Sequence, residues 1–183
     1  PDQVKFGDDI YEDLARRDFT INAMAWEPKT GQIIDIDSAG QNDLKLGIVR
    51  AVGLPEERIK EDGLRILRAF RFLDAGEPRP RRLEADLQSA IIENLQMLDL
   101  VSSERKWAEL SKIFKGQRRN EIIQLMDDCN VLNRLIKNTK FSMKCQFSGI
   151  PSVDIAILCS EDERTGIELG NHLKEQLKLS NLE

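Results

Sequence analysis

One stretch of the sequence constrains the fold more than any other. Residues 58–72 read RIKEDGLRILRAFRF, and an α-helix advances about 100° per residue. At that spacing Ile59, Ile66, Phe70 and Leu73 fall on one apolar stripe, while arginines wind along the opposite side. The segment therefore predicts an amphipathic helix with an apolar face and an arginine-rich face.

The arginine-rich face is the first candidate site. Asp62 begins a series with a spacing of three residues that continues through Arg65, Arg68 and Arg71. In one helix, Asp62 would present an acceptor one turn before the planar donors of Arg65, and such a pair can read the edge of a nucleotide base. The later arginines can hold phosphates. The alternative is an ordinary solvated helix face with a Glu61–Arg65 ion pair, which is common in amphipathic helices.

A second motif lies upstream. Residues 16–24 read RRDFTINAM, in which Arg16, Arg17 and Asp18 precede an apolar, strand-compatible run. Arg17 can pair with a triphosphate, and Asp18 can accept a hydrogen bond from a ribose hydroxyl. Asn22 adds a donor and an acceptor. The alternative for this segment is a helix end with a surface ion pair.

Together the two motifs resemble signatures of the class II tRNA nucleotidyltransferases and bacterial poly(A) polymerases. Residues 16–24 are similar to the family's RRDFTINAM motif, and residues 61–65 fit its EDxxR motif. The segment 37–44 resembles the family's hinge, and 103–109 resembles its SxERxxxE motif. The tail 177–181 is similar to a weak body-domain sequence. The likeness is strong up to Leu73 and thinner afterwards.

The resemblance implies template-independent addition of CMP and AMP, from CTP and ATP, to the 3′ end of tRNA. By this resemblance, Asp62 and Arg65 recognise the base, and Arg17, Arg68 and Arg71 contact the phosphates. Asp18 contacts the ribose, and Asn22 belongs to the same nucleotide site. Glu61 orients Arg65, and Glu104 and Arg105 support the site. These roles agree with the residue chemistry, because we expect the arginine face to have too few acidic neighbours for ion pairing alone to explain it.

The resemblance also implies Mg²⁺, which the family holds with a DxD motif that follows a glycine-rich segment. No such segment precedes residues 16–24, so we expect a fragment that carries no catalytic residue and no metal ligand of its own. Asp35 and Asp37 have DxD spacing, and alternate residues of a strand point to one face. Their position after the RRD motif instead favours a strand end that enters the hinge.

The bulk composition fits a cytoplasmic protein, or an organellar one if the source is eukaryotic. The 183 residues are 40% hydrophobic and 32% charged, without an apolar run of membrane-spanning length or a signal-peptide pattern. We therefore expect no membrane partner. Cys129, Cys145 and Cys159 are odd in number and widely spaced, as in reducing compartments. The single histidine, His172, argues against histidine-based catalysis.

A net charge of −5 argues at first against an RNA partner. Basic residues nevertheless cluster in 58–82 and 105–119, and acidic residues concentrate in 8–13 and 161–163. A local basic cleft can bind phosphates on an acidic protein. For the second basic cluster, the alternative is a scatter of solvated charges.

We expect an α+β fold that is mostly α-helical. Residues 1–53 would form the C-terminal part of a nucleotidyltransferase head, 54–116 a helical neck and 117–183 the start of a helical body. Strands are predicted near 23–27, 33–37 and 47–52, helices near 56–75, 83–97, 103–115, 118–128, 153–159 and 165–178, and a loop over 139–152. Residues 75–82 depart from the family's neck connection.

Several functions remain open from sequence alone. CCA addition is the first choice, and a bacterial poly(A) polymerase or a CC-only or A-only enzyme shares the same motifs. A noncatalytic RNA- or nucleotide-binding module that has lost its metal site is the alternative from another class. The expected partners are the tRNA 3′ end, CTP and ATP, and the sequence leaves the oligomeric state open.

Overall fold

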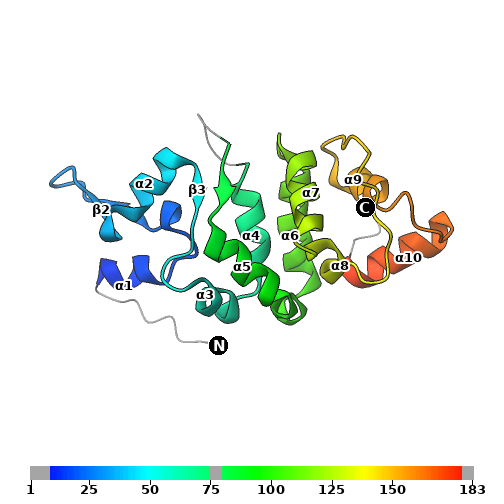
Figure 1. The fold of residues 1–183 in the computed structure, drawn as a ribbon, viewed down its shortest axis with the longest axis horizontal. Coiled ribbons are helices and arrows are strands. Elements are labelled where there is room, and N and C mark those ends of the chain that lie inside the picture. Colours follow the sequence, from blue (N-terminus) through cyan, green and yellow to red (C-terminus); the bar gives the residue numbers. More distant parts are fainter. Residues whose placement is uncertain (1–8, 75–79, 179–183) are drawn as a thin grey trace.

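The computed structural model describes residues 9–74 and 80–178, except for the side chain of Asp37. Its helices are α1 (Ile10–Ala15), α2 (Ala39–Leu46), α3 (Pro55–Glu61), α4 (Leu64–Phe72), α5 (Ala85–Glu93), α6 (Ser103–Phe114), α7 (Arg119–Asp128), α8 (Val131–Leu135), α9 (Pro151–Leu158) and α10 (Gly166–Leu177). Figure 1 shows an elongated molecule whose elements largely follow one another along its long axis, with β2 (Ile33–Asp35) near one end and α10 near the other. The predicted α+β, mostly helical fold is confirmed.

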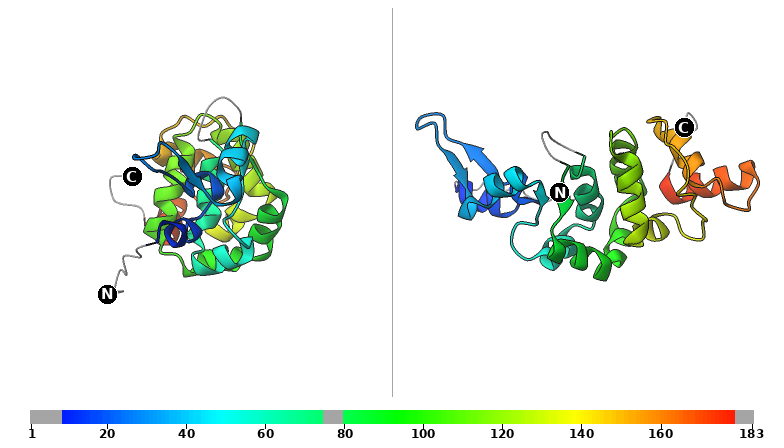
Figure 2. Two further views of the ribbon diagram at one scale, coloured as in Figure 1. Left: turned by 90° about the vertical axis from the view of Figure 1, so that its left-hand side faces the viewer. Right: turned by 45° about the horizontal axis from the view of Figure 1, so that its top comes forward.

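Two small sheets belong to the first half of the chain. Strands β1 (Met24–Trp26) and β2 (Ile33–Asp35) form an antiparallel hairpin that projects from the helices in Figure 2. Strand β3 (Ile48–Val49) pairs in parallel with β4 (Arg82–Leu83). The prediction of a strand over 47–52 was therefore too long. The strand β4 was missed, because two residues carry no readable periodicity.

The prediction of one helix over 56–75 is wrong in one respect, because the helix is interrupted between α3 and α4. Asp62 has an extended backbone (φ −151°, ψ 105°) and Gly63 follows it. A Cβ on Gly63 would lie 2.2 Å from the carbonyl oxygen of Met97, so the backbone of the 3₁₀ helix η3 (Leu95–Leu100) approaches too closely for a side chain. Asp62 is thus not one regular turn before Arg65 in a continuous helix.

Other boundaries also differ from the prediction. Most of the hinge-like segment 37–44 lies in α2, and both carboxylate oxygens of Asp35 accept hydrogen bonds from the first turn of this helix, from Gly40 N at 2.9 Å and Gln41 N at 2.8 Å. Two further 3₁₀ helices lie where the sequence predicted extended backbone. One is η1 (Thr20–Asn22), in the strand-compatible run after Asp18, and the other is η2 (Ile36–Ser38), at the end of the predicted strand 33–37. The predicted helix 83–97 ends at Glu93 and η3 follows, while α1 and α8 were not predicted.

A single buried apolar cluster extends from Phe19 to Leu177. The predicted inward stripe is confirmed, because Ile59, Ile66, Phe70 and Leu73 are all buried. The cluster includes residues on both sides of 53/54 and 116/117, so it does not mark the predicted boundaries between head, neck and body. These boundaries stay predictions. The departure at 75–82 and the tail motif 177–181 lie largely outside the described residues.

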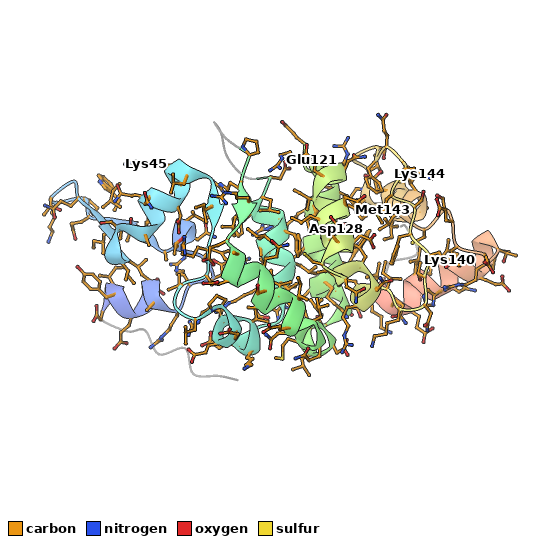
Figure 3. The ribbon with its side chains drawn as sticks, in the orientation of Figure 1. Lys45, Glu121, Asp128, Lys140, Met143 and Lys144 are labelled. Carbon is orange, nitrogen blue, oxygen red and sulfur yellow. The ribbon has the colours of Figure 1, made fainter. Side chains whose placement is uncertain are left out.

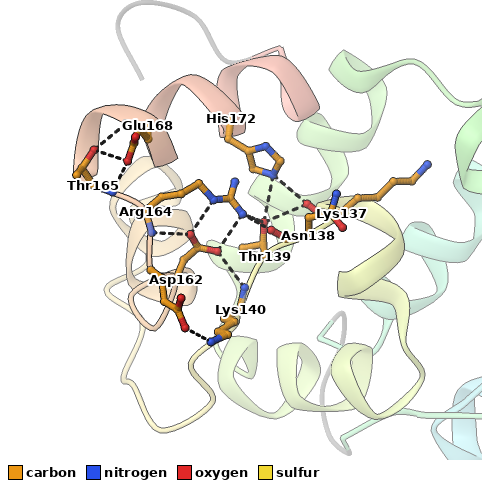
Figure 4. A network of polar contacts seen from close by, with 10 residues as sticks. Lys137, Asn138, Thr139, Lys140, Asp162, Arg164, Thr165, Glu168 and His172 are labelled. Atoms are coloured by element: carbon orange, nitrogen blue, oxygen red, sulfur yellow. Dashed lines mark hydrogen bonds and ion pairs between the residues drawn. The ribbon is translucent and has the colours of Figure 1, made fainter.

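Polar contacts fasten the last helices to the preceding loop (Figure 4). Arg164 pairs with Asp162 at 2.8 Å and donates to the carbonyl of Asn138. His172 Nε2 lies 2.9 Å from the carbonyl oxygen of Lys137. The histidine therefore holds a loop in place here. Within the described ranges, no helix is long and apolar enough to cross a membrane.

Candidate nucleotide-binding site

Six of the seven predicted nucleotide-binding residues line one pocket of about 500 Å³. That volume is within the roughly 300–1,000 Å³ range of small-molecule sites. The lining comes from the end of α1, from η1, from the α3–α4 junction and α4, and from the start of α6: Arg17, Asp18, Asn22, Asp62, Leu64, Arg65, Arg68, Phe72 and Arg105. The fold thus brings residues from the RRD, EDxxR and SxERxxxE motifs to one cavity.

Asp18 is a buried residue of the pocket lining, and both its carboxylate oxygens accept hydrogen bonds. Its Oδ2 accepts hydrogen bonds from Arg68 Nε at 2.7 Å and Nη2 at 2.5 Å. Its Oδ1 accepts from Phe19 N at 2.9 Å and Asn22 Nδ2 at 3.2 Å. Arg68 and Asn22 therefore fix the carboxylate, and a ribose hydroxyl would have to share an oxygen that already has partners.

Arg65 connects three segments. Its Nη1 donates to the carbonyl of Arg58 at 2.8 Å and to Glu61 Oε2 at 2.6 Å, and its Nη2 donates to the carbonyl of Arg16 at 3.2 Å. Glu61 also pairs with Arg58 at 2.6 Å. The Glu61–Arg65 ion pair that the sequence offered as an alternative is thus present, and it involves an arginine that lines the pocket. The orienting role of Glu61 stays a prediction.

Asp62 reaches the pocket from the extended junction. Its Oδ1 accepts from Leu64 N at 3.1 Å, which caps α4, and its Oδ2 accepts from Arg105 Nη2 at 2.8 Å. Arg105 lies in the first turn of α6 and is half exposed, so the pair is open to solvent. Glu104 is exposed and does not line the pocket. Its supporting role stays a prediction that no contact with the pocket supports.

Arg71 does not line the pocket. Its Nε lies 2.9 Å from Oε2 of Glu109, which is only 4% exposed and also accepts from Lys112 at 2.9 Å. Its guanidinium lies 4.4 Å from the ring centroid of Phe72. The Arg71 and Glu109 atoms form a close ion pair without hydrogen-bond geometry. Arg71 therefore joins α4 to α6.

The expectation of few acidic neighbours is wrong, because carboxylates reach the arginines from other turns and elements. Arg17 pairs with Asp13 at 2.8 Å, and Arg68 pairs with Asp18. The i, i+4 spacing of Asp13 and Arg17 can be read from the sequence, whereas the partner of Arg68 lies 50 residues away along the chain. Counting Arg17, Arg65, Arg68 and Arg105 against Asp18 and Asp62, the lining still has a formal charge of +2.

Phe72 was missed as a pocket residue. Its ring lies 5.6 Å from the guanidinium of Arg68 and gives the cavity an aromatic wall. The signal was available in the sequence, since Phe72 follows Arg65 by seven residues and Arg68 by four on the same helix face.

The carboxylates of this pocket do not fit a Mg²⁺ site. Mg²⁺ prefers several oxygen ligands, whereas Asp18 is bound by Arg68 and Asp62 by Arg105. Residues 9–74 and 80–178 contain no group of three metal-binding side chains. Asp35 caps α2 with both oxygens. The side chain of Asp37 lies outside the described residues.

Comparisons with known proteins agree with the sequence motifs. Residues 1–50 match the family described as "Poly A polymerase head domain", and residues 82–143 match "Probable RNA and SrmB- binding site of polymerase A". The chain is 44% identical to the CCA-adding enzyme of Ligilactobacillus salivarius over 124 residues, which cover 68% of this chain and 30% of that enzyme. It is 38% identical to the Bacillus velezensis CCA-adding enzyme over 135 residues, 74% of this chain and 33% of that enzyme.

Solved structures give the same answer for the fold. The Thermotoga maritima CCA-adding enzyme complexed with tRNA superimposes with a TM-score of 0.76 at 28% identity, covering 94% of this chain and 45% of that one. The Bacillus stearothermophilus CCA-adding enzyme in complex with CTP gives 0.77 at 25% identity, covering 97% and 45%. The chain spans about a third of the length of these curated relatives. It belongs to the family of class II nucleotidyltransferases that comprises the CCA-adding enzymes and the bacterial poly(A) polymerases.

Proposed function

We propose that this protein adds CMP and AMP, from CTP and ATP, to the 3′ end of tRNA, and that the pocket around Asp62 and Arg65 selects the nucleotide. One observation carries the proposal: the fold gathers an acceptor, a donor fork and further arginines from distant motifs in a single cavity. Relatives named CCA-adding enzymes, and solved neighbours with CTP or tRNA, support it.

The chemistry of the two side chains suits cytosine and adenine. Both bases present an exocyclic amino donor beside a ring nitrogen that accepts. Asp62 can accept from the amino group, and Arg65 can donate to the ring nitrogen. Uracil and guanine present a carbonyl beside a ring N–H. The carbonyl would face the Asp62 carboxylate, two acceptors together, and the ring N–H would face the Arg65 guanidinium, two donors together. The pair therefore favours CTP and ATP.

Nucleotide entry requires exchange of ion pairs. Arg17 and Asp13 are both more than half exposed, and such surface pairs contribute only about 0.2–1 kcal/mol. A triphosphate carries several charges and can displace Asp13 from Arg17. Arg105 can likewise leave Asp62 as the base arrives, because its side chain is half exposed. Asp18 can accept from the ribose while Arg68 and Asn22 keep it oriented.

The proposed reaction uses Mg²⁺, which supplies charge neutralisation and activates the attacking hydroxyl when bound. We place its ligands outside the described residues. Cytoplasmic location is part of the same proposal, because the similar enzymes are bacterial and the described cysteines are unpaired thiols. Poly(A) addition is the second candidate, favoured by the match to a poly(A) polymerase head domain.

The test measures incorporation of each nucleotide by the full-length protein on tRNA that lacks its CCA end. Wild type should use CTP and ATP far better than UTP and GTP, and Arg65→Ala should reduce that discrimination. Asp62→Asn, which exchanges an acceptor for a donor, should shift the preference among bases. Lys60→Ala, an exposed neighbour on α3, is the control.

Two outcomes would change the conclusion. Equal losses for all four nucleotides in Arg65→Ala, with base ratios preserved, would reduce the pocket to a structural or phosphate-binding role. A long adenosine tail on the product, rather than a single terminal AMP, would establish the poly(A) alternative.

A further inference from the structure

A second pocket, of about 430 Å³, lies beyond the C-terminal end of α4, next to Leu73, and shares no residue with the nucleotide pocket. Its floor is apolar and includes Leu73, Leu83 and Ile122. The polar part of the lining is Gln88, one acid, Glu121, and three arginines: Arg81, Arg82 and Arg118. Figure 3 shows Glu121 at the upper end of α7.

Arg118 is committed to holding this pocket together. Its Nε and Nη2 donate to Glu121 Oε2 at 3.0 and 2.8 Å. Its Nη1 donates to the carbonyl of Leu73 at 2.9 Å and to the carbonyl of Arg81 at 3.2 Å. The carboxylate of Glu121 is therefore already neutralised.

Arg81 and Arg82 differ from Arg118 in their partners. Within residues 9–74 and 80–178, neither side chain forms an ion pair with a carboxylate, and the side chain of Arg81 donates only to the carbonyl of Phe72 at 3.4 Å. Partial burial lowers the pKa of Arg81. By contrast, Arg17, Arg68 and Arg105 in the first pocket all pair with acids.

Both arginines project from fixed backbone. The carbonyl of Arg81 accepts from Arg118, and the backbone N of Arg82 donates to the carbonyl of Gly47 at 2.9 Å within the β3–β4 ladder. Guanidinium groups on a fixed backbone lose less freedom when they bind a phosphate. The site is thus built before any anion arrives.

We propose that this second pocket binds a backbone phosphate of the RNA substrate, through Arg81 and Arg82. The inference rests on the proposed function, since it takes RNA as the source of the phosphate. Among the described residues of its lining, the pocket offers cations but no free carboxylate to read a base. This is expected for a contact that positions RNA without reading its sequence.

The test measures binding of tRNA lacking its CCA end to the full chain over a range of salt concentrations, by fluorescence anisotropy. Arg82→Ala should weaken binding roughly tenfold at low salt and reduce the slope of log K against log salt by about 0.7–0.9 for each phosphate that is no longer neutralised. Arg82→Lys should retain most of the affinity, and Arg81→Ala/Arg82→Ala should bind more weakly than Arg82→Ala. Lys29→Ala in the β1–β2 turn is the matched loss of charge.

A substitution of opposite sign sharpens the test. Glu121→Gln removes the acid that neutralises Arg118 and should tighten RNA binding several-fold. Asp128→Asn, further along the same helix (Figure 3), removes an equal charge outside the pocket and should change binding less. Arg82 is exposed, so unchanged melting of Arg82→Ala would show that folding is intact.

The remaining outcomes separate this inference from the proposed function. If Arg82→Ala has the same RNA affinity and salt slope as Lys29→Ala, while the wild-type protein binds both RNA and CTP, the second site alone is overturned. An equal loss of CTP and RNA affinity in Arg82→Ala would identify the site as one for the triphosphate and overturn RNA as its source. A wild-type protein that binds CTP but no RNA would refute both the RNA site and the tRNA half of the proposed function.

Discussion

Replacing Arg71 by alanine should mainly destabilise the protein, although the sequence motif places this residue among the phosphate contacts. The substitution leaves Glu109 buried, at 4% exposure, with Lys112 as its remaining partner. Breaking one side of a buried pair costs roughly 3–5 kcal/mol. Lys112 compensates for part of this cost, and removal of the guanidinium that lies 4.4 Å from the Phe72 ring centroid adds about 0.5–1 kcal/mol.

The net loss in the free energy of unfolding should be about 3 kcal/mol. For a chain of this size, each kcal/mol lowers the melting temperature by roughly 2–4 °C, so the expected decrease is about 6–12 °C. Thermal unfolding followed by circular dichroism measures it. Lys112→Ala removes the half-exposed partner of the same acid and should cost less than about 1 kcal/mol.

A double substitution tests the cause. Arg71→Ala/Glu109→Gln removes the uncompensated charge and should recover a substantial part of the lost melting temperature. If Arg71→Ala melts like wild type but binds CTP markedly more weakly, Arg71 contacts phosphate and the reasoning from Glu109 is refuted. A double variant that melts no higher than Arg71→Ala would exclude the stranded carboxylate as the cause.

Three more predictions concern the buried and capping groups. Asp18→Ala should erode the preference for ribonucleotides over deoxyribonucleotides, since a hydrogen bond to a charged group contributes roughly 1.5–3 kcal/mol; unchanged sugar preference in a folded variant would remove Asp18 from the ribose contact. The 183-residue chain alone should not extend tRNA with CTP, ATP and Mg²⁺, because the pocket carboxylates are bound by arginines and Asp35 caps α2; incorporation abolished by Asp35→Asn would contradict this. Burial raises the pKa of the Cys159 thiol from 9.0 to about 12, so its stabilising contribution is complete below about pH 9 and is lost as the pH rises towards 12; the urea midpoint of wild type should fall more steeply across that window than that of Cys159→Ala.

Much of the site was predictable because its motifs are local. Residues 16–18 and 61–65 each carry a recognisable pattern, and the fold brings Arg17, Asp18, Asp62 and Arg65 from them to one pocket. The apolar stripe from Ile59 to Leu73 also predicted correctly which side chains are buried. Hydrophobic periodicity and short motifs depend on neighbours in sequence, which a single chain displays directly.

What was missed depends on neighbours in space. The break at Gly63 is invisible to periodicity, because the apolar pattern continues across it, while the cause is the backbone of Met97, far along the chain. The acid that pairs with Arg71 lies on α6, and the acid that pairs with Arg68 lies before η1. The β3–β4 pairing likewise joins residues that no local signal connects.

The three hydrogen bonds of Arg65 limit how its base preference can be engineered. The side chain proposed to read the base also satisfies the main-chain carbonyls of Arg16 and Arg58. A library that varies residue 65 to obtain a UTP- or GTP-using variant will therefore select for the stability of this junction as much as for specificity. Productive variants should combine a change at 65 with a second polar side chain that replaces the donors to these two carbonyls.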